Sequence, residues 1–217
     1  MTSWGPFHRH AQRYDAWFGG PTGSVLFPAE VEALRLLAGH LSPPFLEVGV
    51  GTGAFAQALN IALGVDPAPG ALRRAAGRGI EVVRAVGEAL PFREGAFGGV
   101  FFINTFCFVP DPTAVLREAL RVVRPGGGLV VAEVEKESPW GRFYGQKKAQ
   151  GHLFYRHASF YSLAEIKAMF HLAGLRVEGS SCTLLQPPAD PPKPEKAQSG
   201  IVPGASFVCL LGRKARA

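Results

Sequence analysis

Apolar positions in the middle of the chain alternate between short continuous runs and segments with helical spacing. The runs over residues 45–48, 61–65, 81–84, 100–103 and 129–132 are predicted strands, because each is short and bounded by turn-forming residues. Strands that alternate with helices at such short intervals predict a parallel sheet with helices on both faces.

Helices are predicted between these strands over residues 54–59 and 70–76, and a third begins after the fourth strand. The third has the clearest boundaries. Asp111 is expected to be its N-cap, and Pro112 takes the first helical position, where a backbone N–H is not needed. The Pro-Gly-Gly-Gly segment at 125–128 is expected to end it.

The last third of the chain follows a different pattern. An amphipathic helix is predicted over residues 162–172, with Ser162 and Glu165 forming a capping box at its start. Two further strands, 176–181 and 206–211, are joined by a proline-rich connector that has no helical spacing. A connection without a helix suits an antiparallel pair, so the sheet is expected to end in a hairpin.

Length and composition suit a single cytoplasmic α/β domain of 217 residues, 47% hydrophobic and 18% charged. The chain has no run of about 18 apolar residues that would predict a membrane span, and its first ten residues lack the apolar stretch of a signal peptide. Cys107, Cys182 and Cys209 are too scattered for a disulfide framework or a zinc site. We expect three buried, reduced thiols and no metal.

The net charge of +6 raises the question of an anionic partner. The 23 lysines and arginines are spread along the chain and form no continuous stripe. A solvated basic surface is therefore expected, and attraction of anionic substrates or RNA is the alternative.

The strongest chemical signal is the glycine-rich turn after the first predicted strand. Gly49, Gly51 and Gly53 alternate there, so the backbone can turn tightly and a ligand can approach it closely. With Ala54 the spacing also satisfies the dinucleotide fingerprint, which keeps a nicotinamide-dependent oxidoreductase as an alternative.

Two carboxylates distinguish between these ligands. Asp66 ends the second predicted strand, where it can accept hydrogen bonds from the hydroxyls of an adenosine ribose; the alternative is a helix N-cap. Glu47 lies inside the first strand, close to where the phosphates of a dinucleotide would lie and be repelled. A ligand with an amino group and no phosphate suits Glu47 better, and S-adenosylmethionine (SAM) is such a ligand.

Residues 45–133 resemble the cofactor-binding core of class I SAM-dependent methyltransferases. Within these they are most similar to the small branch that includes the ubiquinone and menaquinone biosynthesis methyltransferases. The resemblance rests on four motifs in order: the glycine turn at 46–53, the acidic loop at 64–67, the segment 88–97 and the helix and stop at 111–127.

The resemblance implies a Rossmann-like, doubly wound sheet of seven strands in the order 3-2-1-4-5-7-6, with the last strand antiparallel. SAM is the implied cofactor and S-adenosylhomocysteine the product. Asn104 and Thr105 should line the site too, because they follow the fourth strand and ligands of open α/β sheets bind at the carboxyl ends of strands. The expected cofactor-binding residues are Tyr14, Glu47, Gly49, Val50, Gly51, Gly53, Asp66, Pro67, Gly87, Glu88, Ala89, Asn104 and Thr105.

One position departs from the family pattern. Many relatives carry an acid at the position of Val86, where it bonds the adenine amino group. Valine cannot do this, so Glu88, or backbone groups of Gly87 and Glu88, are expected to bind the adenine instead.

Two segments are expected to close the site of this single domain. A cover helix over about residues 8–20 places Tyr14, Trp17 and Phe18 on one face, with plain packing onto the sheet as the alternative. A lid insertion over about residues 136–160 is rich in aromatic and basic residues, with a solvated linker helix as the alternative. Tyr14, His152 and Tyr155 are weak candidates for a general base.

The sequence therefore predicts a SAM-dependent methyltransferase that transfers a methyl group to a small molecule by in-line displacement. Three other functions remain as alternatives: an RNA or protein methyltransferase, a SAM-binding protein without catalysis, and the nicotinamide-dependent oxidoreductase. Nucleic acid is not the expected partner, because the Asn/Asp-Pro-Pro-aromatic tetrad of base-methylating relatives is missing after the fourth strand. The acceptor atom and the oligomeric state are not predicted.

Overall fold

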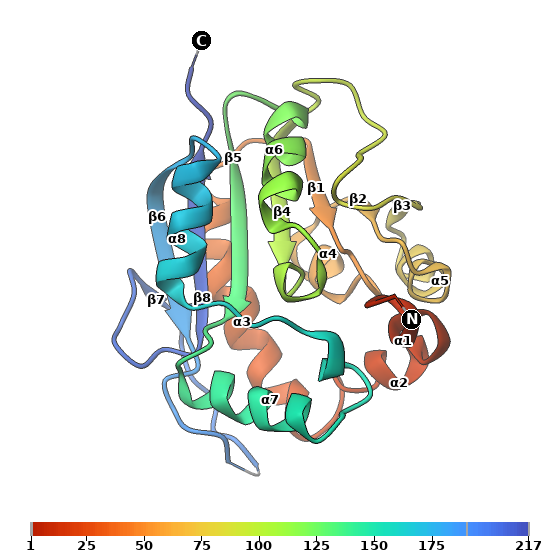
Figure 1. Cartoon of the computed structure of the whole chain (residues 1–217), viewed down its shortest axis with the longest axis vertical. Helices are drawn as coiled ribbons and strands as arrows, with labels where there is room; N and C mark the ends of the chain where they lie inside the picture. The colour runs from red at the N-terminus through yellow and green to blue at the C-terminus, as the bar shows by residue number, and fades with distance from the viewer. Residues whose placement is uncertain (1, 190, 217) are drawn as a thin grey trace.

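The computed structural model describes residues 2–189 and 191–216, and one mixed sheet runs through it (Figure 1). The strand order is β3-β2-β1-β4-β5-β8-β6-β7. Strands β1 to β5 are parallel, and β8 is antiparallel to both β5 and β6. The strands are β1 (Phe45–Val48), β2 (Leu63–Val65), β3 (Glu81–Val83), β4 (Phe97–Ile103), β5 (Val123–Val134), β6 (Arg176–Thr183), β7 (Gln198–Ser199) and β8 (Phe207–Arg213).

The predicted strand order and the antiparallel hairpin are confirmed. The prediction of seven strands misses β7, a two-residue strand that pairs with β6 at the edge of the sheet. The predicted start of β5 at residue 129 is also wrong, because the strand begins at Val123. Gly128 pairs there with Gly99 of β4 and Arg213 of β8. A Cβ on Gly128 would lie 2.9 Å from the Gly212 carbonyl oxygen, so glycine permits close pairing at a point where the sequence suggested only a turn.

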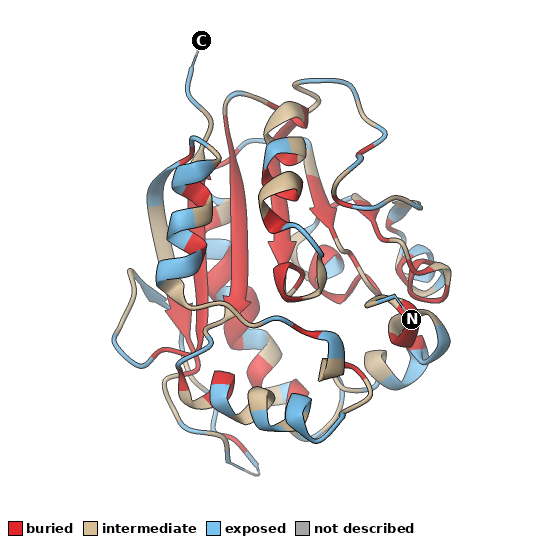
Figure 2. Ribbon diagram, in the orientation of Figure 1, coloured by how far each residue is buried: buried red, intermediate tan, exposed pale blue. Residues whose placement is uncertain are grey.

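Helices cover both faces of the sheet, as the alternating side chains of its central strands require. In β4, Phe101 and Ile103 pack toward α3, α4 and α5, whereas Val100 and Phe102 pack toward α6 and α8. Figure 2 shows the central strands buried between these layers. The helices are α1 (Gly5–Arg9), α2 (Ala11–Asp15), α3 (Gly23–Ala38), α4 (Ala54–Leu59), α5 (Pro69–Gly77), α6 (Pro112–Val122), α7 (Pro139–Ala149) and α8 (Leu163–Leu172), with single 3-10 turns η1 (Phe106–Phe108) and η2 (Tyr155–His157).

Both predicted helix caps are confirmed. The Asp111 carboxylate accepts a hydrogen bond from the Ala114 backbone N–H at 2.9 Å. Ser162 and Glu165 form the reciprocal capping box at the start of α8. These contacts are local in sequence, so they follow from residue type and spacing.

The amino-terminal region differs from the expected single cover helix over residues 8–20. It forms two short helices, α1 and α2, that separate at His10, whose backbone leaves the helical region at φ −123° and ψ 31°. Helix α3, which has 16 residues and contains Pro28, is not among the predicted helices. Helix α3 packs against the sheet and, as shown below, supplies a side chain to the site.

The carboxyl ends of β1, β4 and β5 point toward the level of α2 and α7 (Figure 1). This is the edge where open α/β sheets bind ligands. No helix in the described residues has both the length and the apolar character needed to cross a membrane.

Candidate cofactor and acceptor site

The turn after β1 has the backbone geometry that its glycines predict. Gly49, Gly51 and Gly53 have φ values of 77°, 54° and 82°, in the left-handed region that disfavours other residues. A Cβ on Gly49 would lie 2.4 Å from side-chain atoms of Thr105, whereas Gly51 faces open space apart from the Gly49 carbonyl oxygen at 3.9 Å. Gly49 is therefore required by packing, and Gly51 leaves the backbone accessible to a ligand.

Asp66 follows β2 and stabilises this turn directly. Its carboxylate accepts hydrogen bonds from the backbone N–H groups of Gly51 at 3.0 Å and Ala68 at 2.7 Å. The side chain is 8% exposed and borders the adjoining cavity. Burial raises its pKa to about 6, and the two backbone hydrogen bonds act in the opposite direction. Asp66 thus connects the glycine turn to the start of α5, and it also faces the space where a ligand can enter.

Glu47 is buried in β1 and only partly hydrogen-bonded. It is 2% exposed, and its Oε2 has no hydrogen-bond partner among the described residues. Burial, followed by the charge of Asp66, holds its pKa well above the usual value. A positively charged group that reached this oxygen would stabilise the ionised form.

These groups border a cavity of about 390 Å³. All of the expected cofactor-binding residues line it except Gly53 and Ala89. Gly53 lies behind the turn, where its Cβ position is 3.0 Å from Ala75. Ala89 is exposed and pairs through its backbone with Val86. Gly53 and Ala89 therefore contribute to the backbone conformation of their loops, which explains why the family motifs include them although they do not reach the cavity.

Several lining residues were not identified from the sequence. Thr2, Ser3, Trp4 and Phe7 border the same cavity, although they lie far in the chain from the glycine turn. The Ser3 hydroxyl donates a hydrogen bond to the Phe108 carbonyl at 2.7 Å across 105 residues of sequence. No local pattern could have shown this contact. The other lining residues outside the expected cofactor-binding set are Phe18, Val48, Thr52, Ala54, Phe55, Ala85, Val86, Ile103, Phe108, Val109 and Pro110.

The cavity wall formed by residues 85–92 is held in place by α6. Glu118 accepts a hydrogen bond from the Leu90 backbone N–H at 2.8 Å, and Arg121 donates to the carbonyls of Leu90 and Phe92 at 3.0 and 2.8 Å. The Arg121 guanidinium also pairs with Glu118 and lowers the pKa of that carboxyl. Glu118 and Arg121, which belong to the family motif, therefore hold the loop over residues 85–92 in place and do not line the cavity themselves.

Asn104 lies at the end of β4 in a strained conformation. Its φ of 50° is in the left-handed region, which asparagine tolerates better than most other side chains. Its backbone N–H is fixed to the Ala132 carbonyl at 2.8 Å. Asn104 borders the first cavity and also a second, so it lies at their junction. Strain of this kind is typical of functional positions.

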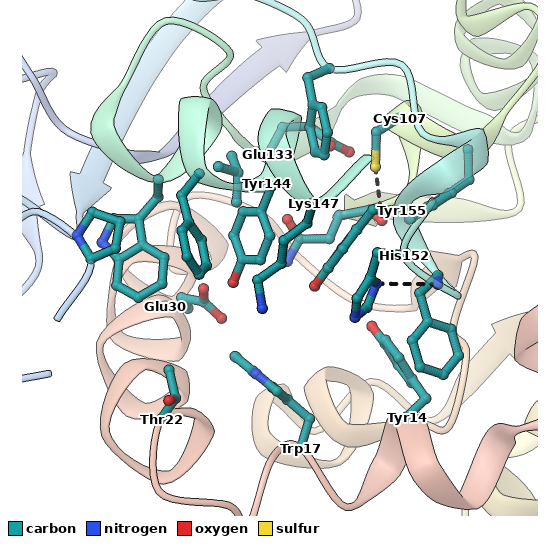
Figure 3. A pocket seen from close by; sticks show the side chains of 18 of the residues that line it. Tyr14, Trp17, Thr22, Glu30, Cys107, Glu133, Tyr144, Lys147, His152 and Tyr155 are labelled. Atoms are coloured by element: carbon teal, nitrogen blue, oxygen red, sulfur yellow. Dashed lines mark hydrogen bonds between the residues drawn. The ribbon is translucent and has the colours of Figure 1, made fainter. Parts of the chain in front are cut away.

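The second cavity, which we call the aromatic chamber, has a volume of about 540 Å³. Residues of α7 and η2 form part of its wall. Figure 3 shows side chains from α2, α3 and α7 pointing into it. Tyr14, Phe18, Phe55, Asn104 and Phe108 line both cavities. The other ring-bearing lining residues are Trp17, Trp140, Phe143, Tyr144, His152, Phe154, Tyr155 and Phe160.

The three candidates for a general base all line the aromatic chamber. Burial raises the pKa of Tyr14 and of Tyr155, which disfavours a tyrosinate at neutral pH. Burial and the charges of Lys147 and Arg13 lower the pKa of His152, so its imidazole is neutral. The ring of His152 stacks on Tyr155 with a centroid distance of 4.8 Å. Of the three, only His152 is in a protonation state that can accept a proton near pH 7.

The chamber is closed by segments that lie far apart in the chain. Trp140 of α7 is 2% exposed, and its indole N–H donates to the Gln186 carbonyl at 3.0 Å. This bond fixes α7 against the proline-rich connector, from which Pro188 and Ala189 reach the chamber. Glu195 accepts hydrogen bonds from the Leu185 and Gln186 backbone N–H groups at 2.8 and 2.7 Å, which orders the connector.

The first cavity fits SAM in three respects. The free Oε2 of Glu47 suits an amino group, the second carboxylate at Asp66 suits ribose hydroxyls, and the open side of Gly51 lets a ligand approach the backbone. Two buried carboxylates in one small cavity disfavour the phosphates of a dinucleotide. The adjoining chamber leaves room for a second reactant beside the first.

Comparisons with known proteins agree with this geometry. The family model Methyltransf_11, described as a methyltransferase domain, matches residues 46–131. An uncharacterized protein of Mycobacterium tuberculosis is 44% identical over 203 residues, which cover 93% of this chain and 71% of that protein. An uncharacterized protein of Methanocaldococcus jannaschii is 37% identical over 172 residues, covering 78% of this chain and 80% of that protein.

A solved structure from Thermotoga maritima is similar over almost the whole chain. It is described as a SAM-dependent methyltransferase and possible histamine N-methyltransferase. The two chains share 32% identity with a TM-score of 0.88, and the match covers 97% of this chain and 99% of the other. Fold, cavity and relatives define a class I methyltransferase. The chain belongs to the family of SAM-dependent methyltransferases.

Proposed function

We propose that the chain transfers the methyl group of SAM to a small molecule held in the aromatic chamber. The observation that carries this proposal is the shared wall of the two cavities, formed in part by Tyr14, Asn104 and Phe108. A cofactor in the first cavity and an acceptor in the second would meet at this wall. When bound, SAM supplies a methyl group on a positively charged sulfur, which is intrinsically reactive.

The residues of the first cavity would divide the cofactor between them. Glu47 would bind the amino group, Asp66 would accept hydrogen bonds from the ribose, and the accessible backbone at Gly51 would let the cofactor approach closely. Val86 is 43% exposed and borders this cavity, so adenine would cover an apolar side chain there. Glu88 and the backbone of Gly87 are the groups on the same wall that can bind the adenine amino group.

The chamber would contribute alignment and the exclusion of water. In the transfer, the acceptor's lone pair would form the new bond to the methyl carbon, and the electron pair of the sulfur–carbon bond would return to sulfur. A proton that the acceptor atom carries is then lost to His152 or to water. Holding the acceptor in line supplies proximity worth several kcal/mol, and the closed aromatic wall protects the reaction from solvent.

A small amine is the first acceptor to test. The similar protein from Thermotoga maritima is described as a possible histamine N-methyltransferase, and the match extends over nearly all of both chains. Histamine therefore belongs in the first acceptor screen, beside small thiols, phenols and quinone precursors.

Cofactor selectivity provides the direct test of the first cavity. We expect S-adenosylhomocysteine to bind with micromolar affinity and NAD at least about a hundredfold more weakly, because phosphates placed beside two buried carboxyl groups would lose water without gaining a positive partner. Isothermal titration calorimetry with both ligands measures this difference. Tighter binding of NAD would refute the methyltransferase proposal.

A polymer acceptor is the second function to test, because the net charge is +6. We expect RNA and DNA to bind only at low salt, since contacts to several phosphates weaken steeply as salt rises. Binding to mixed RNA and DNA is measured by fluorescence anisotropy at low and physiological salt. Submicromolar RNA binding at physiological salt, together with no turnover of any small acceptor, would instead favour an RNA methyltransferase.

A further inference from the structure

Glu30 is a buried carboxyl that the proposed methyl transfer does not use. It lies on α3, is 4% exposed, and lines the aromatic chamber. Its Oε2 has no hydrogen-bond partner among the described residues, and none of the salt bridges in that part of the chain includes it. Figure 3 shows the carboxyl directed toward the open centre of the chamber. A carboxyl in this setting is stabilised most by a positively charged group that enters the chamber.

The walls around Glu30 favour a cation as well. Rings of Trp17, Phe143, Tyr144 and Tyr155 line the same chamber. Aromatic faces attract ammonium groups, and the attraction increases when both partners are shielded from water. The chamber already shows this interaction, because Lys147 Nζ lies 4.7 Å from the centre of the Phe143 ring. A carboxyl among aromatic rings is the recognition chemistry of an organic ammonium group.

The position of Glu30 restricts the role of that ammonium group. Glu30 lines the chamber but not the cofactor cavity, whereas Tyr14 and Asn104 line both. A group bound to Glu30 therefore lies away from the junction where methyl transfer would take place. An ammonium group paired with a carboxylate also has no free electron pair, so it cannot be the nucleophile. The acceptor needs a second, neutral group at the junction.

We propose that the chamber recognises a compact acceptor with an ammonium group on Glu30 and a separate nucleophile, such as a neutral nitrogen, a thiol or a phenol, beside Tyr14 and Asn104. This inference rests on the proposed function and specifies its substrate class. It assigns Glu30 to binding and orientation and leaves the transfer step as described above.

The ionisation of Glu30 supplies a signature of such binding. Burial raises the pKa of Glu30 to about 8, so the carboxyl is largely protonated at pH 7. The titratable groups that interact electrostatically with it are Tyr14, Tyr144, Tyr155 and Cys209, and none of these is a cation. The basic side chains that line the chamber are Arg13, Lys147 and His152. An entering ammonium group would favour the ionised carboxyl, so binding at pH 7 should release about one proton per ligand.

The test compares ligands that share one end and carry a cationic, neutral or anionic group at the other. Tyramine, 4-ethylphenol and 3-(4-hydroxyphenyl)propionate form one series, and cysteamine, ethanethiol and 3-mercaptopropionate form a smaller one. Each is titrated by calorimetry into protein saturated with S-adenosylhomocysteine, in two buffers of different ionisation enthalpy. In at least one series the cation should bind roughly tenfold more tightly than the neutral compound, and the anion most weakly. Proton release should accompany the cation alone.

Two variants on the same helix show whether Glu30 is responsible. Glu30→Gln keeps the size of the side chain and should abolish both the preference for the cation and the proton release. Glu32→Gln is the matched control, because the Glu32 carboxylate instead accepts a hydrogen bond from the Ala197 backbone N–H. The control should behave as the wild type. Glu30→Asp, which keeps the charge, should retain part of the preference and covers the case in which Glu30→Gln does not fold.

The outcomes separate this inference from the proposed function. If the wild type does not bind S-adenosylhomocysteine, the proposed function fails. If that ligand binds but both series show equal or weaker binding of the cation, or no binding at millimolar concentration, only the inference fails. Tightest binding of the anion would likewise overturn it and would point to Lys147. An unchanged preference in Glu30→Gln would overturn it as well.

Discussion

Gly49→Ala is expected to abolish measurable binding of S-adenosylhomocysteine and to lower the melting temperature strongly. The new methyl group would lie 2.4 Å from both Cγ2 and Oγ1 of Thr105, at a φ of 77°. The left-handed backbone costs about 1–2 kcal/mol for a residue with a Cβ, and overpacking costs about 1–3 kcal/mol more. Relief of the clash would displace either the glycine turn or Thr105, and both border the first cavity. Thermal unfolding and calorimetry measure the two effects.

Gly79 provides a matched control for this prediction. It has a similar φ of 81°, but nothing lies within 4 Å of its Cβ position. Gly79→Ala should therefore show the backbone cost alone and bind the cofactor normally. Adding Thr105→Ala to Gly49→Ala should restore part of the lost stability, since it removes both atoms at 2.4 Å. Equal losses in the two glycine variants, without rescue by Thr105→Ala, would show that the packing at Gly49 is not what the turn requires.

Asp66→Ala is expected to weaken binding of S-adenosylhomocysteine by roughly 10²- to 10⁴-fold. This range corresponds to two hydrogen bonds from ribose hydroxyls to a charged acceptor, at about 1.5–3 kcal/mol each. The variant should also be less stable, because the Gly51 and Ala68 backbone N–H groups lose their acceptor. In the wild type, affinity should fall as the pH drops through about 6, the pKa to which burial raises this carboxyl. A protonated Asp66 cannot accept both ribose bonds.

Two further variants separate binding from stability. Asp66→Asn keeps the size and one acceptor oxygen, so it should bind with intermediate affinity and lose the pH step near 6. Asp111→Ala removes an aspartate that caps α6. The loss of this cap should destabilise the fold by about 1 kcal/mol, which lowers the melting temperature, and should leave the affinity for S-adenosylhomocysteine unchanged. If Asp66→Ala lost stability and kept wild-type affinity, Asp66 would be a structural residue only.

The sequence by itself determined the topology and one half of the site. Gly49 and Gly51 permit a left-handed backbone, Asp111 and Ser162 cap helices through contacts three residues away, and the lack of a helix between β6 and β8 favours a hairpin. Each of these features depends on residues that are close in the chain. Local periodicity and backbone preference are therefore sufficient to predict them.

The sequence posed a choice between ligand and cap for Asp66, whereas only the tertiary structure shows that one position can bond two backbone segments and still border the cavity. The carboxylate accepts hydrogen bonds from the backbone of Gly51 in the glycine turn and of Ala68 at the start of α5, and it also borders the cavity. The extension of β5 back to Val123 was decided in the same way, since Val123 pairs with Phe97 of β4 and Gly128 pairs with Arg213 of β8, near the far end of the chain.

The aromatic chamber also depends on tertiary structure alone. Glu30 comes from a helix with no recognised motif, Trp140 from α7 and Pro188 from a connector, and they meet because α3 and α7 both reach the end of the sheet where β5 ends (Figure 1). The free oxygen of Glu30 can be recognised only when every neighbour is known, because a glutamate on a helix usually faces water. Local backbone chemistry determined the glycine turn of the first cavity, where we propose that the cofactor binds, whereas packing between distant segments determined the aromatic chamber.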